Sequence, residues 1–527
     1  MTDAPRTTPK RGFPLHPLLF AAYPVLFLYA HNAGEFPARA MIAPLVVLIT
    51  AAVVLWVVLG LILRNTRKAA VLVSLVYILI FFFRLIRETV IHLGGADLPV
   101  SPEVTTFIVL GVLFLAVAIP TVRTRRQLRM LTRIINVAAI VLILIPASHI
   151  AYLTTEAPRH NLKVPTGVPA WDTAPLPEDT SALPDIYYII CDAYGRDDIL
   201  REYYGHNNAP FLDWLETQGF TVARKSHSNY NYTGTSLPTS FNMMHLVPLV
   251  KYLEASCADV TSMSIAMQHS AVTRFLKRRG YRTVAFSTGY AITDVINADT
   301  FLSPTPWRDN ELITGLLQMT PFGWAFHKQS FKSLSRSRIL FTLDSLKSLP
   351  TSGSPKFVYA HIMAPHRPFV FGANGEHVNP THLYPPGGPL FPGDAERDDY
   401  RKFYVGQLRF LNSKLMEVIT AIKQRSTTPP IIILQGDHGP CSILPNPRKP
   451  TPEGIRERMS ILNAYHLPGG GAEKLYPTIT PVNSFRVVFN HYFGANLALE
   501  EDDSYYEPGG IITKMLRDLD AKKEQEP

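Results

Sequence analysis

Three segments of the chain place metal-binding residue types directly after short apolar runs. Asp192 follows the run in PDIYYIICDAYGR, and the pair Asp437 and His438 follows the run in PPIIILQGDHGP. His361 ends the run in PKFVYAHIMAPHRPF, and His366 comes five residues later. Carboxylates and imidazoles are ligands that divalent metals such as Zn²⁺ take in proteins. Each residue alone has an ordinary structural explanation, such as a cap or a turn, but together they predict a metal site.

The hydroxyl-rich segment SHSNYNYTGTSLPTSFNMMHL supplies a candidate nucleophile. Its Ser, Thr, Asn and Gly content is also typical of a polar loop with no chemistry. The functional interpretation selects Thr233, because a bound metal would lower the pKa of its hydroxyl and make it an attacking alkoxide.

The elements that must position these residues follow an α/β pattern. Short strands are expected at Ile186–Ile190, Thr283–Phe286, Phe357–Ala360 and Ile431–Leu434, and helices between them at Ala209–Gln218, Ser270–Arg279 and Lys402–Lys423. Strands that alternate with helices indicate a mostly parallel sheet covered on both faces. Sites in such sheets form beyond the carboxyl ends of the strands, so the candidate ligands should meet at one edge.

The first 155 of the 527 residues differ from the rest in hydropathy and charge. Five apolar runs, at about 15–31, 41–63, 69–90, 104–122 and 134–153, each have roughly the length that crosses a ~30 Å hydrocarbon core. Residues 1–155 contain 14 Lys and Arg against 5 Asp and Glu, which accounts for the whole net charge of +9. Because this excess lies between apolar runs, it indicates five membrane spans rather than nucleic-acid binding.

The loop charges predict an orientation. Positive residues precede the first run and separate the second from the third and the fourth from the fifth: Arg6, Lys10, Arg11, Arg64, Arg67, Lys68, Arg123, Arg125, Arg126, Arg129 and Arg133. The alternate loops carry fewer, namely Arg39, Arg84 and Arg87. The N-terminus is therefore expected in the cytoplasm and the chain after about residue 154 outside it, on a multi-pass protein of the bacterial inner membrane. Arg84 is the only charge near a span interior, which favours an anchor or lipid-access platform over a transporter.

Composition divides the chain into four predicted parts. These are a five-helix membrane domain at 1–153, a Pro-rich linker at 154–184, an extracytoplasmic catalytic domain at 185–515 and a polar tail at 516–527. The linker holds six prolines, which suit neither a helix nor a central strand. Cys191, Cys257 and Cys441 can form at most one internal disulfide, which excludes a disulfide framework.

With these motifs, residues from about 184 to 495 resemble the sulfatase branch of the alkaline phosphatase superfamily. Together with the membrane half, the chain most resembles the phosphoethanolamine and phosphoglycerol transferases, including the lipoteichoic acid synthases. The resemblance implies an alkaline-phosphatase-like α/β domain behind an all-α membrane domain. In those families an acid after the first strand, a nucleophilic Thr and a late Asp-His pair hold a divalent metal. The positions that match here are Asp192, Thr233, Asp437 and His438.

Two further features of the family match by spacing. A pair of His residues five apart holds phosphate or a second metal, which implies that His361 and His366 bind substrate. The family nucleophile stands in a pattern like T-x-x-S-x-P, which Thr233, Ser236 and Pro238 reproduce. This spacing favours Thr233 over Thr235, which remains the alternative.

Several positions depart from the family patterns, and these departures limit the reactions that the site could catalyse. The transferases usually have Glu where this chain has Asp192, and sulfatases usually have a second Asp where it has Ala193. Sulfatases also convert a Cys or Ser in a C/S-x-P-S-R pattern to formylglycine. Here that position is Thr233, which cannot give the aldehyde, and the Arg position is Leu237. The resemblance therefore argues against ordinary sulfatase chemistry.

The implied function is metal-dependent transfer of a phospholipid-derived head group, phosphoethanolamine or phosphoglycerol, through a phospho-Thr233 intermediate. The expected cofactor is one divalent metal, Zn²⁺ or Mn²⁺, with a second metal as an alternative. The expected partners are a phospholipid donor, the membrane and a surface lipid or glycan acceptor, with no nucleic acid. Two alternatives stay open: a membrane-anchored phosphodiesterase or sulfatase-like hydrolase, and a catalytically silent membrane sensor.

Overall fold

The structure is a computed structural model, and it forms two compact units. It describes residues 13–31, 38–94, 100–155, 163–165, 169, 172–173, 176, 183–255, 258, 260–290, 292–304, 311–349, 355–378, 380, 396–444, 449–507 and 516–517. The first unit comprises Met1–Pro158 and Trp307–Gln329, and the second comprises Arg159–Pro306 and Ser330–Pro527. Several predictions lie outside the described residues: the charges at Arg6, Lys10 and Arg11, most of the Pro-rich linker, Cys257, and the tail beyond residue 517.

The described part of the first unit is helical. Its helices are α1 (His16–His31), the 3₁₀ helix η1 (Ala38–Met41), α2 (Ile42–Leu63), α3 (Thr66–Phe81), α4 (Phe83–Gly94), α5 (Pro102–Arg123), α6 (Arg129–Thr155) and α13 (Glu311–Gln318). Three of them, α2, α5 and α6, are long and apolar enough to cross a membrane, and the pair α3 and α4 adds a fourth if it forms one bent span. With 16 residues, α1 is shorter than the ~20 that span a bilayer upright. The predicted helical membrane region is confirmed, whereas the number of five spans stays a prediction.

Two features of this unit were not predicted from the sequence. The third apolar run is interrupted at Phe82, where the axes of α3 and α4 differ by 55°. Helix α13 belongs in sequence to the predicted catalytic domain, yet its Leu312 and Leu316 pack in the same cluster as Ala21 and Val25 of α1. Residues 307–329 therefore belong to the first unit, whereas the residues before and after them belong to the second.

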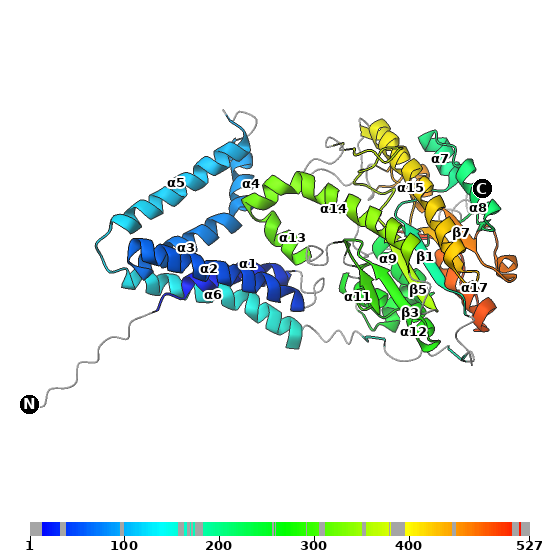
Figure 1. The fold of residues 1–527 in the computed structure, drawn as a ribbon, viewed down its shortest axis with the longest axis horizontal. Coiled ribbons are helices and arrows are strands. Elements are labelled where there is room, and N and C mark those ends of the chain that lie inside the picture. The colour runs from blue at the N-terminus through cyan, green and yellow to red at the C-terminus, as the bar shows by residue number, and fades with distance from the viewer. Residues whose placement is uncertain are drawn as a thin grey trace, which may run out of the picture. The chain divides into compact units, whose positions relative to one another are not determined.

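The second unit is built on a seven-stranded sheet (Figure 1). Its strands are β1 (Ile186–Cys191), β2 (Thr221–Val222), β3 (Arg282–Phe286), β4 (Thr300–Leu302), β5 (Lys356–Ile362), β6 (Ile431–Gly436) and β7 (Asn463–His466), in the order β2-β7-β6-β1-β5-β3-β4. The pairs from β6 to β4 are parallel, while β7 and β2 add antiparallel pairs at one edge. A separate short pair joins β8 (Tyr505–Tyr506) to β9 (Leu516–Arg517). The predicted mostly parallel α/β sheet and its four predicted strands are confirmed.

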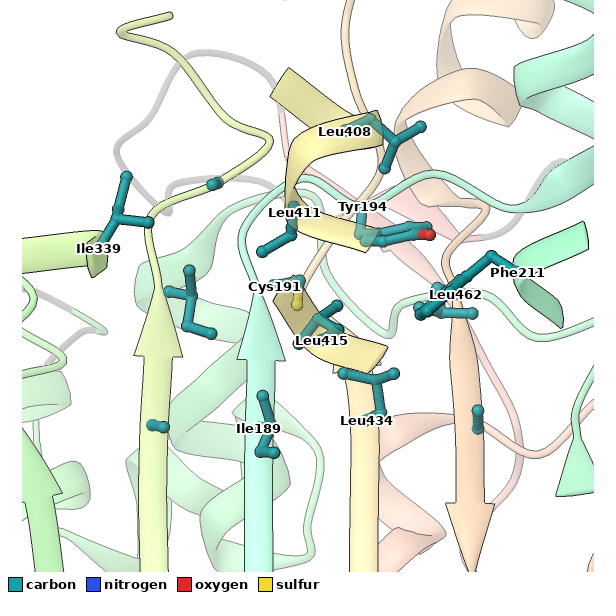
Figure 2. Close-up of a cluster of buried hydrophobic side chains, with 14 of the residues drawn as sticks. Ile189, Cys191, Tyr194, Phe211, Ile339, Leu408, Leu411, Leu415, Leu434 and Leu462 are labelled. Atoms are coloured by element: carbon teal, nitrogen blue, oxygen red, sulfur yellow. The ribbon is translucent and has the colours of Figure 1, made fainter. Parts of the chain in front are cut away.

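Helices cover both faces of this sheet. One face packs against α7 (Asp197–Tyr204), α8 (Ala209–Thr217), α14 (Pro321–Ser348) and α15 (Arg397–Arg425), and the other against α9 (Thr233–Asn242), α10 (Leu246–Tyr252), α11 (Val260–Gln268), α12 (Ala271–Arg278) and α17 (Pro481–Phe493). Because successive strand residues point to opposite faces, Ile189 lies in the first core and Ile190 in the second. Figure 2 shows Leu411 and Leu415 of α15 in one cluster with Ile189 of β1 and Leu434 of β6. The three predicted helices are present as α8, α12 and α15.

One described part of the predicted linker is fixed to the second unit by charge. The carboxylate of Asp172 accepts hydrogen bonds from Nη2 and Nη1 of Arg279 at 2.7 and 2.9 Å, and both side chains are fully buried. The guanidinium also stacks 3.5 Å from the ring centroid of Phe275. A bidentate buried pair of this kind holds the chain ahead of β1 in one place.

Candidate active site

Strand register brings three of the predicted ligands to one edge of the sheet. Cys191 and Gly436, the last residues of β1 and β6, are register partners. Asp192 and Asp437 therefore follow them side by side, and His361 is close to the end of β5 on the other flank of β1. All three side chains are at most 2% exposed. The edge is the carboxyl end of three adjacent parallel strands, as expected from the sequence.

Thr233 is the first residue of helix α9, so the segment around it is not simply a polar loop. Its Oγ1 donates a hydrogen bond to Oδ2 of Asp437 at 2.6 Å and lies 3.2 Å from Nε2 of His438. The N-terminus of a helix favours negative charge because its first N–H groups and its dipole point there. The Thr233 oxygen thus occupies a position at which an anion is stabilised.

The remaining hydroxyls of α9 hold the helix in place. Ser236 Oγ donates to the backbone carbonyl of Asp437 at 2.7 Å, and Leu237 is buried in the core. Thr235 Oγ1 donates to the carbonyl of Tyr232 within its own turn at 3.1 Å. The structure brings the hydroxyl of Thr233, and not that of Thr235, into hydrogen-bonding distance of the candidate ligands.

Asp192, Asp437 and His438 form a group that can hold a metal ion, because one ligand atom of each lies within 4.8 Å of the others. Nδ1 of His438 lies 3.0 Å from the carbonyl oxygen of Gly439, which can only accept, so the ring proton is on Nδ1 and Nε2 carries the lone pair. Nε2 is 3.4 Å from Oδ2 of Asp437 and 3.7 Å from Oδ1 of Asp192. The second oxygen of Asp437 accepts the N–H of Ala193 at 3.0 Å, which fixes the orientation of the carboxylate.

The electrostatics of this group favour a cation. Burial raises the pKa of Asp437 to about 6, and the nearby charge of Asp192 adds to the shift. Burial opposes ionisation of Asp192 as well, but His366 and the other neighbouring histidines hold its pKa below the ordinary value. Burial lowers the pKa of His438 to about 3, so its imidazole is neutral. Asp192 Oδ1 is buried with no hydrogen-bond partner among the described residues, which is costly unless an ion completes the site.

The two other predicted histidines flank this group. Nε2 of His361 lies 3.4 Å from Oδ2 of Asp192. Burial lowers the pKa of His361, but the hydrogen bond and charge of Asp192 outweigh it and the net pKa is raised. The backbone N–H of His366 donates to the Asp192 carbonyl at 3.0 Å, and its ring centroid is 6.2 Å from that of His438. Nδ1 of His366 lies 2.5 Å from the carbonyl oxygen of Arg367, which leaves the lone pair of Nε2 available.

Arg458 is a residue of this site that the sequence did not reveal. It comes from α16 (Pro452–Met459), is only 5% exposed, and its Nη2 donates a hydrogen bond of 3.0 Å to Nε2 of His438. Nη1 and Nε donate to the carbonyls of Gly439 and Asn231 at 3.0 and 2.9 Å. A buried guanidinium beside this group suits a phosphate or another oxyanion. No motif marks Arg458, which stands twenty residues after His438.

The part of the sequence that contains the candidate site matches a protein family. A family model described as Sulfatase matches residues 184–483, more than half of the chain. The chain belongs to the sulfatase family. This membership supports an enzymatic role, and the site described above lies within the matched residues of this sulfatase-family chain. No curated protein sequence matches the chain.

Several solved structures are similar to this sulfatase-family chain at low identity. The C-terminal periplasmic domain of EptC from Escherichia coli, in complex with Zn, is 12% identical over 67% of this chain and 96% of its own, with a TM-score of 0.43. The integral membrane lipooligosaccharide phosphoethanolamine transferase A from Neisseria meningitidis is 13% identical over 87% and 89%, with a TM-score of 0.36. BT1596, a 2-O GAG sulfatase, is 12% identical over 60% and 72%, with a TM-score of 0.38.

Proposed function

We propose that the chain is a metal-dependent transferase that moves a phospholipid-derived head group, phosphoethanolamine or phosphoglycerol, to a surface lipid or glycan. The observation that carries the proposal is the position of Thr233. Its hydroxyl stands at a helix N-terminus, 2.6 Å from a carboxylate of Asp437 and 3.2 Å from the lone-pair nitrogen of His438. A Thr in this position suits covalent catalysis by the hydroxyl itself.

Asp192, Asp437, His438 and the Thr233 oxygen would hold a divalent metal. The unpartnered Oδ1 of Asp192 and the neutral imidazole of His438 fit this role, and the mixed oxygen and nitrogen ligands suit Zn²⁺ or Mn²⁺. When bound, such an ion supplies Lewis-acid stabilisation of negative charge and a lower pKa for the hydroxyl. His361 is the residue that would bind substrate phosphate or a second metal beside it.

The first displacement forms a bond between Thr233 Oγ1 and the phosphorus of the donor. Asp437 Oδ2 accepts the hydroxyl proton along the existing 2.6 Å hydrogen bond. The bond from phosphorus to the diacylglycerol oxygen breaks, and that oxygen takes up a proton from water and leaves as diacylglycerol. The N-terminus of α9, the guanidinium of Arg458 and the imidazole of His366 surround the position where charge grows on the phosphate oxygens.

The second displacement returns Thr233 to its starting state. A hydroxyl of the acceptor releases its proton to water and attacks phosphorus, the bond from phosphorus to Oγ1 breaks, and Oγ1 takes back the proton that Asp437 Oδ2 holds. Splitting the transfer in this way replaces one difficult step by two easier ones. The membrane helices support a donor that is already in the bilayer, and the loop charges support an extracytoplasmic catalytic domain on the bacterial inner membrane.

Mass spectrometry of the full chain tests this function. After incubation with phosphatidylethanolamine or phosphatidylglycerol and rapid quenching, peptides that contain Thr233 should gain the mass of the corresponding head-group phosphate. Addition of an acceptor glycan should then discharge the adduct onto the glycan. Release of free head group without transfer would identify the hydrolase alternative. Absence of both adduct and turnover in metal-loaded protein would point to the silent sensor.

A further inference from the structure

Two adjoining cavities of about 260 and 270 Å³ lie within the first unit. Tyr23, Pro24, Phe81 and Phe82 line both cavities, which therefore lie side by side between α1 and the junction of α3 and α4. The remaining residues of the first cavity, Phe20, Tyr77, Ile78 and Leu142, make its lining almost wholly apolar. We call the two cavities together the α1–α3 groove.

The α1–α3 groove lies beside a break between two helices and beside a proline within a third. Helix α3 ends just before Phe82, and α4 continues at an angle of 55°. In α1, Pro24 has no backbone N–H to donate within the helix. Interrupted helices in membrane proteins occur where they line a cavity, and they often mark a binding site.

The second cavity of the groove ends at a pair of opposite charges. Arg84 and Glu88 line it, and Nε of Arg84 lies 2.8 Å from Oε1 of Glu88. Both side chains are more than half exposed, so their charges are accessible. Met319, which follows α13, lines the same cavity. The loop charges place this end of the groove on the outer side of the membrane, where the catalytic half is expected.

We propose that the α1–α3 groove binds one molecule of a zwitterionic phospholipid, phosphatidylethanolamine, from the outer leaflet. An acyl chain occupies the apolar cavity, the phosphate meets Arg84, and the ammonium group meets Glu88. A zwitterionic head group and this ion pair have complementary charges, because each provides one positive and one negative group. The inference rests on the proposed function only in taking the bound lipid as the donor of the head group.

Selectivity of this groove between phospholipids comes from its charged end. An acyl chain that enters it leaves other lipid tails rather than water, so apolar burial adds little affinity. Phosphatidylglycerol has no ammonium group and would leave Glu88 facing uncompensated negative charge. We therefore expect phosphatidylethanolamine to be retained about tenfold more tightly, the size of one charge-assisted hydrogen bond at a partly exposed site.

The test measures lipid binding in a Thr233→Ala background, where the lipid cannot be consumed. The full chain is reconstituted with phosphatidylethanolamine that carries a photoactivatable group in its acyl chain, and the labelled residues are mapped. Ile78→Trp fills the apolar cavity, while Ile145→Trp makes the same change on an exposed position of α6 that lines neither cavity. Arg84→Gln removes the phosphate contact at an exposed position and leaves the helix intact.

We expect labels at Tyr23 and Phe81 that disappear in Ile78→Trp, persist in Ile145→Trp and fall about tenfold in Arg84→Gln. Equal labelling of all exposed helix faces in every variant would mean ordinary boundary lipid and would overturn the site. Equal competition by phosphatidylglycerol would overturn the head-group assignment. Because labelling needs no turnover, its result stands whether or not transferase activity is found.

Discussion

Replacing the hydroxyls of Thr233 and Thr235 one at a time separates the nucleophile from its neighbour. The two residues share one turn at the start of α9, but their hydroxyls differ in contacts. That of Thr233 donates to Asp437 Oδ2, and that of Thr235 donates to the carbonyl of Tyr232. Thr233→Ala, Thr233→Ser and Thr235→Ala form a matched set in which helix and strand packing are preserved.

The expected magnitudes follow from these contacts. The single hydrogen bond of Thr235 is worth about 0.5–1.5 kcal/mol. Since 1.36 kcal/mol corresponds to a tenfold change in rate, Thr235→Ala should lower the rate by about tenfold or less. Thr233→Ala removes the atom that bonds to phosphorus, and losing a covalent nucleophile costs at least about 10³-fold. Thr233→Ser keeps an oxygen on the helix N-terminus and should retain partial activity.

The assay combines head-group transfer with intact-mass detection of the covalent adduct and with metal content. Asp192, Asp437 and His438 remain in all three variants, so each should still bind metal and unfold at nearly the wild-type temperature. Those two measurements distinguish loss of the nucleophile from loss of the site. An active Thr233→Ala variant, or an adduct that maps to Thr235, would refute the assignment.

Four further outcomes are expected. His438→Ala removes a proposed metal ligand after β6, so metal content and activity should fall together while the helix and strand content is retained. Full metal occupancy in this variant would mean that the ligand is another residue. Burial raises the pKa of Glu507 from 4.5 to about 7. Between these values the folded chain keeps a proton that the unfolded chain has released, so the free energy of unfolding should fall as the pH rises from about 4.5 to 7. The gain in unfolding temperature from Glu507→Gln should therefore grow over that interval and then level off, and a gain that is independent of pH would contradict the explanation. Asp172→Ala leaves the buried guanidinium of Arg279 without its carboxylate and should destabilise the second unit by about 3–5 kcal/mol in denaturant unfolding, whereas an effect below about 1 kcal/mol would mean that water already reaches the pair. A reporter that is active only in the cytoplasm, fused to the C-terminus, should stay silent, and a strong signal would overturn the predicted orientation.

The sheet and most of the candidate site could be predicted because they depend on local patterns. Asp192 and Asp437 each follow an apolar run directly. This pattern predicts a buried strand with a polar group at its carboxyl end. The sequence did not give the order of the strands; in the structure β1 and β6 are neighbours in register, which places those groups side by side. The spacing of Thr233 to Ser236 also had a structural basis, since Ser236 holds the start of α9 against the Asp437 carbonyl.

The features that escaped prediction depend on tertiary contacts. The start of α9 is rich in Gly, Ser and Thr, which are poor helix formers, and burial of Leu237 and Phe241 overrides that propensity. Arg458 reaches the site through the path of the chain after β6, which no spacing rule specifies. The interruption at Phe82 lies within an unbroken apolar run, where hydropathy alone shows only one continuous segment.

The position of α13 has a consequence for anyone who produces the catalytic half as a secreted protein. Leu312 and Leu316 are buried against helices of the first unit. A version that begins at residue 159 would carry these leucines without their cover, with about 1.5–3 kcal/mol of unfavourable hydration for each exposed side chain. Such a face promotes self-association. Replacing residues 307–329 as well with a short Gly- and Ser-rich connector removes the uncovered leucines, so this version should stay monodisperse.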